Sequence, residues 1–556
     1  MSKIGSMRVG VTVITTVIAA AGLLAGCGSG SSHSGSSTTA NPTGGAAAAG
    51  VGPARNPYLA SDVYPVTHVD PAQSDSIPYP VARGTFHVDP TKQPRVAGGP
   101  INYMTLAATS PDYRWITSTD GVRYVDVRDG GFTEVASMDA PGAKVTPPAQ
   151  VDAVVDQDFT NSDQVRAAVS SWGLDWVSAM GNGVYVLVDK DNRLYYNTSA
   201  GDIVVFALKN KDKPEDGIQI VKTFDYKPFL TGQGFAGAPE KIVGLDMTYD
   251  GHLVVLSNKG MAVLNRDLTG DAQQVRFGDD ELVTNSMAID ESGGIYAASD
   301  KVMRKVVWTG SKLSTDPADG AWSSPYDFGR QPPTVKFGSG TGSTPTLMGY
   351  GKNGDQLVVI TDGSDHMKLV AFWRNQIPEG FQQKPGTKSD RIADQIQVTA
   401  GKKDPLPEFI QSEQSVVVNG YGAFVVDNMH PGGDPNRLVD VLTGGPIDQA
   451  PTGMQRFEWD PTAHKWNSVW ERGDVVSVSM VPTVSSASNM VFVNGYSKAD
   501  GWDVTGLDWN TGETVHRTIF GQSNRGNGAY ALIEFTPDGD LIFNSISGPF
   551  RARLTN

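Results

Sequence analysis

The chain has 556 residues, a formal net charge of −15, a pI near 5.0 and one cysteine. This composition excludes a disulfide-stabilised scaffold and a mostly disordered chain, and the lack of a second long apolar run excludes a polytopic membrane protein. Because phosphate backbones select basic surfaces, the acidic balance argues against nucleic acid as a main partner. The 63 glycines and 34 prolines exceed the usual share and favour a turn-rich, all-β chain.

The first 26 residues have the sequence of features that is typical of an export signal. Lys3 and Arg8 precede an apolar run over residues 9–24, which ends in Leu24-Ala25-Gly26-Cys27. A run of this length with small residues at its end is typical of a secretory signal. The last four residues resemble the lipobox of bacterial lipoproteins. The resemblance implies cleavage behind Gly26 and a diacylglycerol thioether on Cys27, which would anchor the protein on the extracytoplasmic side of the cell membrane. The alternative is a chance cysteine in an uncleaved apolar segment.

Three further segments are expected. Residues 27–53 hold Cys27 and a Gly, Ser, Thr and Ala linker that is too poor in apolar side chains to order itself. Residues 54–100 lack periodicity and are expected as an extended arm, which either crosses the face of the domain or supplies an outer strand. Residues 101–556 form the folded body. With no other cysteine, this body must be stable without disulfides.

The body repeats one pattern of short strands. An apolar strand, a turn such as Asp-Gly or Gly-Gly, and a second apolar strand recur, for example over residues 244–256 and 285–298. Such turns between apolar runs are typical of hairpins. Recurring units bury their apolar faces by stacking on their neighbours. The pattern predicts a seven- or eight-bladed β-propeller of four-stranded antiparallel blades. Two tandem β-sandwiches are the structural alternative.

The pattern also predicts which strands lie innermost. Eight such strands are expected, near residues 103–107, 175, 246, 285, 344, 415, 476–480 and 529–535, with a second strand at 184–188 in the second unit. Long insertions are expected at 139–170, 311–338, 374–410 and 429–453. Helix signals are sparse, and the one predicted helix spans residues 160–169, where a polar residue can cap its start.

Two blades resemble known propeller families. Residues 506–515 (Gly-Leu-Asp-Trp-Asn-Thr-Gly-Glu-Thr-Val) resemble a blade of the quinoprotein-alcohol-dehydrogenase-like propellers. Residues 285–298 resemble a blade of the gluconolactonase and strictosidine-synthase-like propellers, where the resemblance implies that an asparagine such as Asn285 can bind a divalent metal. Each likeness covers about a dozen residues, so it bears on the fold more than on either activity.

Polar residues near the starts of the innermost strands form a candidate metal site. Asp175, Asp246, Asn285 and Glu413 would supply oxygen ligands that suit a hard cation such as Ca²⁺, if they converge on the axis. The alternative is that they cap strand ends. No catalytic residue and no other cofactor is predicted.

These features predict a lipid-anchored, extracytoplasmic propeller that acts as a binding or scaffold module of the cell envelope. Its partners would be the membrane, through Cys27, and an envelope protein, a glycan or a small ligand at the channel mouth. A Ca²⁺-dependent hydrolase of the lactonase type is the main alternative, and a quinone-dependent dehydrogenase is a third.

Overall fold

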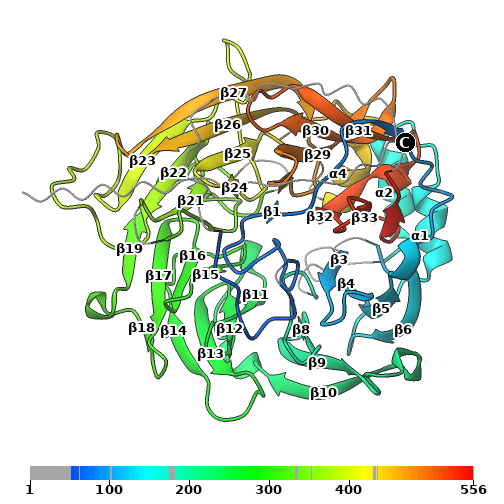
Figure 1. Cartoon of the computed structure of the whole chain (residues 1–556), viewed down its shortest axis with the longest axis horizontal. Coiled ribbons are helices and arrows are strands. Elements are labelled where there is room, and N and C mark those ends of the chain that lie inside the picture. The colour runs from blue at the N-terminus through cyan, green and yellow to red at the C-terminus, as the bar shows by residue number, and fades with distance from the viewer. Residues whose placement is uncertain are drawn as a thin grey trace, which may run out of the picture. The chain divides into compact units, whose positions relative to one another are not determined.

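Eight antiparallel sheets surround a central axis, as Figure 1 shows. The computed structural model describes residues 52–554 apart from residues 62, 101–102, 174–181, 332–335, 352–353, 430–433 and 435. Seven sheets contain a four-stranded meander, and the eighth contains three strands. The predicted all-β propeller is therefore confirmed, and tandem sandwiches are excluded. We number the sheets as blades 1 to 8 in chain order.

Blades 1 to 4 follow one another directly along the chain. Blade 1 consists of β3 (Met104–Ala107), β4 (Tyr113–Ser118), β5 (Gly121–Asp126) and β6 (Thr133–Asp139). Blade 2 consists of β7 (Leu187–Val188), β8 (Leu194–Asn197), β9 (Asp202–Leu208) and β10 (Ile218–Asp225). Blade 3 consists of β11 (Ile242–Met247), β12 (His252–Ser257), β13 (Gly260–Asn265) and β14 (Gln273–Arg276). Blade 4 consists of β15 (Ala288–Ile289), β16 (Gly294–Ala298), β17 (Val302–Trp308), β18 (Leu313–Ser314) and β19 (Trp322–Pro325).

Blades 5 to 8 complete the ring. Blade 5 consists of β20 (Thr346–Met348), β21 (Leu357–Thr361), β22 (Lys368–Trp373) and β23 (Ile392–Gln397). Blade 6 consists of β24 (Val417–Asn419), β25 (Gly422–Val426), β26 (Thr452–Asp460) and β27 (Lys465–Val476). Blade 7 consists of β28 (Thr483–Ser485), β29 (Met490–Ser497), β30 (Gly501–Asp508) and β31 (Thr514–Gly521). Blade 8 consists of β32 (Gly528–Phe535), β33 (Leu541–Ser545) and β34 (Phe550–Ala552). The first strands of the blades lie next to the axis, and most of them contact the first strands of both neighbouring blades.

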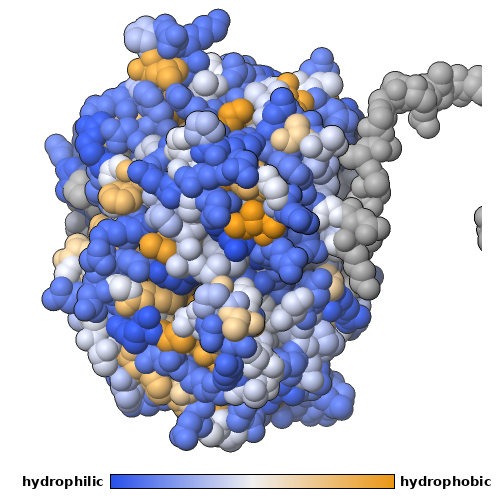
Figure 2. All heavy atoms as spheres, turned by 90° about the vertical axis from the view of Figure 1, so that its left-hand side faces the viewer, coloured by the Kyte–Doolittle hydropathy of each residue, from blue (hydrophilic) through white to orange (hydrophobic). Residues whose placement is uncertain are grey.

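The hydrophobic core lies between neighbouring blades. Trp115 of blade 1 and Tyr196 of blade 2 are buried in one shared cluster. Trp373 of blade 5 packs edge-on against Trp459 of blade 6, with ring centroids 6.1 Å apart. Seen from the side, the ring is mostly hydrophilic, with hydrophobic residues in small separate patches (Figure 2). Stacking of blades therefore buries the apolar faces that a single blade would expose.

The arm before blade 1 crosses the axis and also adds outer strands. β1 (Ser76–Ile77) pairs in parallel with the innermost strand β28, and β2 (Gly84–His87) pairs in parallel with the outer strand β31. Further on, Arg95 bridges to Phe550 on the outer strand of blade 8. The arm thus adds to blades 7 and 8, where the two ends of the ring meet.

Residues 56–77 of this arm, which we call the plug, bind the innermost strand of every blade. Most of the contacts are backbone hydrogen bonds to the last or second-last residue of these strands. The eight donor and acceptor pairs are Ala107 N to Tyr64 O, Ala60 N to Val188 O, Asn56 Nδ2 to Met247 O, Ile289 N to Pro71 O, Leu347 N to Ala72 O, Val418 N to Ser74 O, Val484 N to Asp75 O and Phe535 N to Tyr64 Oη, at 2.7–3.0 Å. Edge groups that would otherwise face the axis are thereby satisfied.

Three α-helices occur in the described residues. α1 (Pro148–Val155) and α2 (Ser162–Ser170) lie in the insertion between blades 1 and 2, and α4 (Arg437–Thr443) lies in the insertion within blade 6. α2 corresponds to the predicted helix, and the Asn161 side chain caps it by accepting from Gln164 N. The helices pack together in one apolar cluster with residues of blade 8. No helix in the described part of the chain is long and apolar enough to span a bilayer.

In two blades the innermost described strand differs from the prediction. In blade 2 the innermost described strand is β7, which was expected as a second strand, and residue 175 lies outside the described residues. In blade 7 the innermost strand is β28 rather than residues 476–480. A continuous apolar run predicts a buried strand but does not show whether that strand is the first or a later one of its blade. The better signal is the turn after β7, where Asp189 Oδ1 accepts from the backbone nitrogens of Asp191 and Arg193, both at 2.9 Å.

Candidate functional site

A cavity lies on the axis at the end of the ring where the innermost strands begin. Its volume is about 660 Å³, counting the space at its mouth. It is lined by the plug and by residues at or just before the starts of the innermost strands. Every blade except blade 3 contributes such residues. The plug hydrogen-bonds to the far ends of these strands and also contributes Thr67 and His68 to the lining. We call this space the axial cavity, and the plug forms its floor.

His68 and Tyr185 stack on each other in the lining. Their ring centroids are 5.7 Å apart and their planes differ by 21°. Nδ1 of His68 lies 3.0 Å from Oδ2 of Asp75, so the carboxylate accepts a hydrogen bond from this nitrogen and orients the ring. Burial raises the pKa of Asp75, and the neighbouring His68 opposes that rise. Burial also raises the pKa of Tyr185 to about 12, so its hydroxyl stays protonated and can donate a hydrogen bond at neutral pH.

Lys336 is a buried cation in the wall of the same cavity. Its side chain stands in the insertion before blade 5, and only 3% of the residue is exposed. The ammonium donates a hydrogen bond to the Gly340 carbonyl oxygen at 2.6 Å. No carboxylate oxygen of the described residues lies within 4.0 Å of it. Burial lowers its pKa to about 8, against the attraction of Asp362 and Asp365.

Amide and carboxylate groups complete the polar lining. Glu413 and Asn428 share two hydrogen bonds. Asn428 Nδ2 donates to Glu413 Oε1 at 3.2 Å, and the Glu413 backbone nitrogen donates to Asn428 Oδ1 at 3.1 Å. Nε2 of Gln414 donates to the Ser479 carbonyl oxygen at 2.8 Å. Asn285 donates weakly to Thr284 Oγ1 at 3.3 Å. The cavity therefore offers donors, acceptors and both signs of charge to a small polar ligand.

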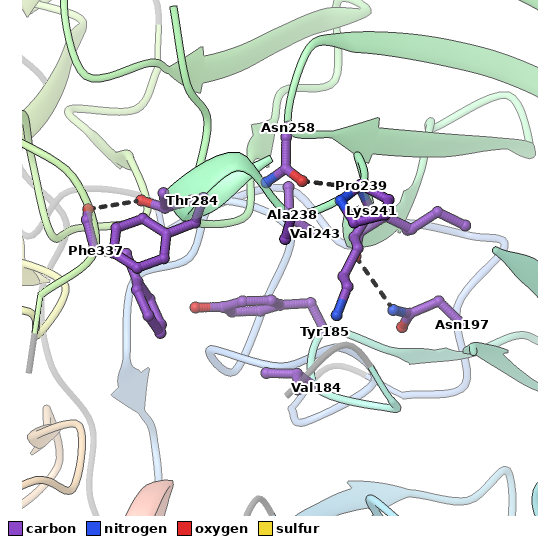
Figure 3. A pocket seen from close by; sticks show the side chains of 12 residues that line it. Val184, Tyr185, Asn197, Ala238, Pro239, Lys241, Val243, Asn258, Thr284 and Phe337 are labelled. Carbon is purple, nitrogen blue, oxygen red and sulfur yellow. Dashed lines mark hydrogen bonds between the residues drawn. The ribbon is translucent and has the colours of Figure 1, made fainter. Parts of the chain in front are cut away.

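A second, more apolar pocket adjoins the axial cavity. Its volume is about 690 Å³, counting the space at its mouth, and it shares Val184, Tyr185, Thr284 and Phe337 with the cavity. We call it the side pocket. Figure 3 shows the Tyr185 ring across it and the Lys241 side chain running toward that ring. Nearby, the Lys241 backbone nitrogen donates to Asn258 Oδ1 at 2.8 Å, which fixes the start of blade 3.

The structure brings together two of the four predicted metal ligands. Asn285 and Glu413 both line the axial cavity. Asp246 is buried on β11 away from that lining, where Gln73 Nε2 of the plug donates to it at 3.2 Å, and burial raises its pKa well above the usual range. Asp175 lies outside the described residues, as does Cys27. The described residues contain no group of three or more His, Cys, Asp or Glu side chains placed for a metal ion, and the calcium site stays a prediction.

Sequence reasoning missed His68, Tyr185 and Lys336. His68 and Lys336 stand in segments assigned to an arm and to an insertion, and no motif surrounds either residue. The sequence pattern places Tyr185 in a second strand, whereas it lies just before the innermost strand β7. The one usable signal was the spacing of blade starts, which did find Asn285 and Glu413.

Several solved structures are weakly similar to the chain. Sqt1 of Saccharomyces cerevisiae is 8% identical with a TM-score of 0.40, and the alignment covers 86% of this chain and 100% of that chain. Dihydro-heme d1 dehydrogenase NirN is 11% identical with a TM-score of 0.38, over 77% and 67% of the two chains. A putative 6-phosphogluconolactonase from Bacteroides fragilis is 10% identical with a TM-score of 0.36, over 76% and 93%. Values this low carry no argument about activity.

Sequence comparison gives a clearer relationship. No known family model matches the chain. An uncharacterized protein of Archaeoglobus fulgidus is 33% identical over 454 residues, which span 79% of this chain and 78% of that protein. An identity of this size over most of both chains is a relationship of whole proteins and not of single blades. The chain belongs to the same protein family as this protein of Archaeoglobus fulgidus.

Proposed function

We propose that the protein is a lipid-anchored, extracytoplasmic binding protein whose propeller holds a small ligand in the axial cavity. The observation that carries the proposal is the plug. It forms a floor under the cavity and bonds to all eight innermost strands, so the lining is held in place before a ligand arrives. Such preorganisation favours binding, because little ordering remains to oppose it.

The buried polar lining favours a small ligand over a protein partner. His68 and Lys336 are almost wholly buried, so a flat protein surface could not reach them. A small molecule that enters the cavity could bond to both. Protein partners usually contact a broad surface with a buried aromatic centre and a polar rim. Figure 2 shows no such continuous apolar area on the side of the ring that it presents.

The membrane anchor is the second part of the proposal. It rests on Leu24-Ala25-Gly26-Cys27 and on the Gly, Ser, Thr and Ala linker that follows. A flexible linker of about 25 residues has a root-mean-square span of roughly 25–30 Å. The head could then sample ligands in the space next to the membrane without leaving it.

The binding function can be tested by identifying a small molecule that stays bound to the protein during purification. The mature protein would be isolated from its native membranes in mild detergent, and small molecules released on denaturation would be compared by mass spectrometry with those from Asn285→Trp. The larger side chain would occupy the axial cavity, since Asn285 is half-buried in its lining. Asn510→Trp, on an exposed turn, is the matched control.

We expect wild type and Asn510→Trp to release the same compound and Asn285→Trp to release none. Adding that compound back at 100 times its Kd should raise the stability of wild type by about 2.7 kcal/mol. Equal release from all three proteins, or no compound from any of them together with no thermal shift from a cell extract, would contradict the proposal.

A further inference from the structure

The two adjoining spaces differ in chemistry. The side pocket contains Phe235 and Phe337, whose rings meet edge to face with centroids 4.6 Å apart, together with aliphatic groups such as Val243. The axial cavity contains His68, Lys336 and Glu413. Val184, Tyr185, Thr284 and Phe337 line both spaces, which therefore adjoin, so one molecule could extend from one into the other. A ligand that fills both spaces needs an apolar part and a polar part.

The apolar part is best matched by a ring. Flat walls from Tyr185, Phe235 and Phe337 enclose the side pocket, and aromatic walls favour a planar or cyclic group that stacks on them or meets them edge-on. Pro239 and Ala238 complete the apolar lining without adding a charge. A flexible polar chain would gain little from these surfaces.

Lys336 determines the sign of the charge on the polar part of the ligand. A buried ammonium is costly unless an opposite charge or several hydrogen bonds compensate it. Of its three N–H groups, one donates to Gly340, and the described residues offer no carboxylate within 4.0 Å. Glu413, the carboxylate of the cavity lining, bonds to Asn428 instead. An anionic group on the ligand would give Lys336 a charged partner that the described residues do not provide.

We infer that the ligand is a small organic anion that carries an apolar ring, with the ring in the side pocket and the anionic group at Lys336. Lys336 and Phe337 are consecutive residues, so the charge and the ring contact one short molecule. Lys241, which lines the side pocket, adds a second positive charge near the ring. This inference rests on the proposed binding function and names the class of ligand.

The test compares three probes of known chemistry on the full-length protein in detergent. 2-Naphthoate carries both a ring and a negative charge, 2-naphthamide keeps the ring without the charge, and acetate keeps the charge without the ring. Isothermal titration should give 2-naphthoate the highest affinity, about 10- to 100-fold above 2-naphthamide, as expected for a charge-assisted hydrogen bond. Acetate should bind more weakly still.

Substitutions test which residues bind the anionic group and which bind the ring. Lys336→Met should lower 2-naphthoate affinity to that of 2-naphthamide and leave the amide unaffected, while Lys222→Met, on an exposed strand, should change neither. Because Lys336→Met also removes a buried charge, we expect the variant to fold. Ala238→Trp should fill the side pocket and weaken both ring compounds. Its position is half-exposed, so folding should be preserved.

Equal binding of 2-naphthoate and 2-naphthamide, or unchanged 2-naphthoate binding in Lys336→Met, would overturn the inference. Isolation of a neutral polyol from the native protein would also overturn it and would leave the proposed binding function standing. If the native protein releases no compound, no cell extract shifts its melting temperature and none of the three probes binds, both proposals fail.

Discussion

The imidazole of His68 and the carboxylate of Asp75 form a buried pair in the floor of the axial cavity, with exposed side-chain fractions of 3% and 0%. Both residues have left-handed backbone conformations, with φ of 66° and 53°. Three further plug residues, Tyr64, Val69 and Gln73, also have positive φ. Such conformations cost free energy in residues other than glycine, and they persist only where the surroundings determine them. The hydrogen bonds from eight blades supply that constraint.

Replacing Asp75 should therefore weaken the plug. Asp75→Ala leaves the buried imidazole without its acceptor, and we expect the free energy of unfolding to fall by about 1–3 kcal/mol. Asp75→Asn keeps one acceptor oxygen and should cost less. Chemical denaturation followed by tryptophan fluorescence would measure both.

Asp212→Ala is the control, because Asp212 is exposed on the turn between β9 and β10. It should leave the unfolding midpoint unchanged. If Asp75→Ala is no less stable than this control, the pair does not hold the plug in place.

Glu534 should make stability depend on pH. It is buried on β32, where Oε1 accepts from Asn544 Nδ2 at 2.8 Å and Oε2 has no hydrogen-bond partner among the described residues. Burial raises its pKa from 4.5 to about 8, against the hydrogen bond from Asn544 and the charge of Arg114. The folded state then holds a proton that the unfolded state releases between these two values. The contribution of Glu534 to the free energy of unfolding is therefore fully present below pH 4.5 and is lost as the pH rises through 8.

Glu534→Gln removes this titration. We expect the variant to match wild type near pH 4.5 and to exceed it in unfolding free energy by a few kcal/mol at pH 9. The pKa of Asp427 is also raised, to about 7, and that of Lys336 is lowered, but both groups are present in the two proteins and cancel in the difference. Glu513→Gln, at an exposed position, should reproduce the wild-type pH profile. A constant difference between Glu534→Gln and wild type across this range would refute the assignment.

The plug should be required for folding, whereas the segment before it should not. Deletion of residues 1–53 keeps every plug hydrogen bond, so its melting temperature should equal that of the intact head. Deletion of residues 1–77 strips the ends of eight innermost strands and removes an unbroken run of buried residues, 63–75. We expect that chain to be insoluble or to melt at a much lower temperature in circular dichroism. Equal melting of both chains would show that the plug is dispensable.

The blade pattern was predictable because each strand follows its partner closely in sequence. β11 and β12 are joined by four residues, and turns of this kind carry their own Asp and Gly signals. An arm across the face of the ring was one of the two expected courses of residues 54–100, but the contacts of the plug were not predictable, for the opposite reason. Asn56 Nδ2 donates to the Met247 carbonyl oxygen across 191 residues of sequence, and hydrogen bonds over such separations leave no mark on side-chain periodicity.

The same reasoning explains which site residues could be predicted. Asn285 and Glu413 precede innermost strands and follow from blade spacing alone. His68 reaches the cavity only because the plug crosses the axis, and Lys336 only because an insertion folds back to it. Asp246 was expected near a strand start, but it is the second-last residue of β11, where it accepts from Gln73 of the plug and lies away from the cavity lining.

Membrane attachment should depend on a single sulfur atom. If Cys27 carries the acyl chains, Cys27→Ser should move the protein from the detergent-extracted membrane fraction to the soluble extracytoplasmic fraction, because one hydroxyl cannot replace two or three chains as an anchor. Immunoblots of the two fractions would measure the shift, and a mass increase on the wild-type N-terminal peptide would identify the lipid. Ser31→Ala in the linker is the control and should remain with the membrane. A Cys27→Ser protein that stays as firmly bound as wild type would instead indicate an uncleaved apolar anchor over residues 9–24.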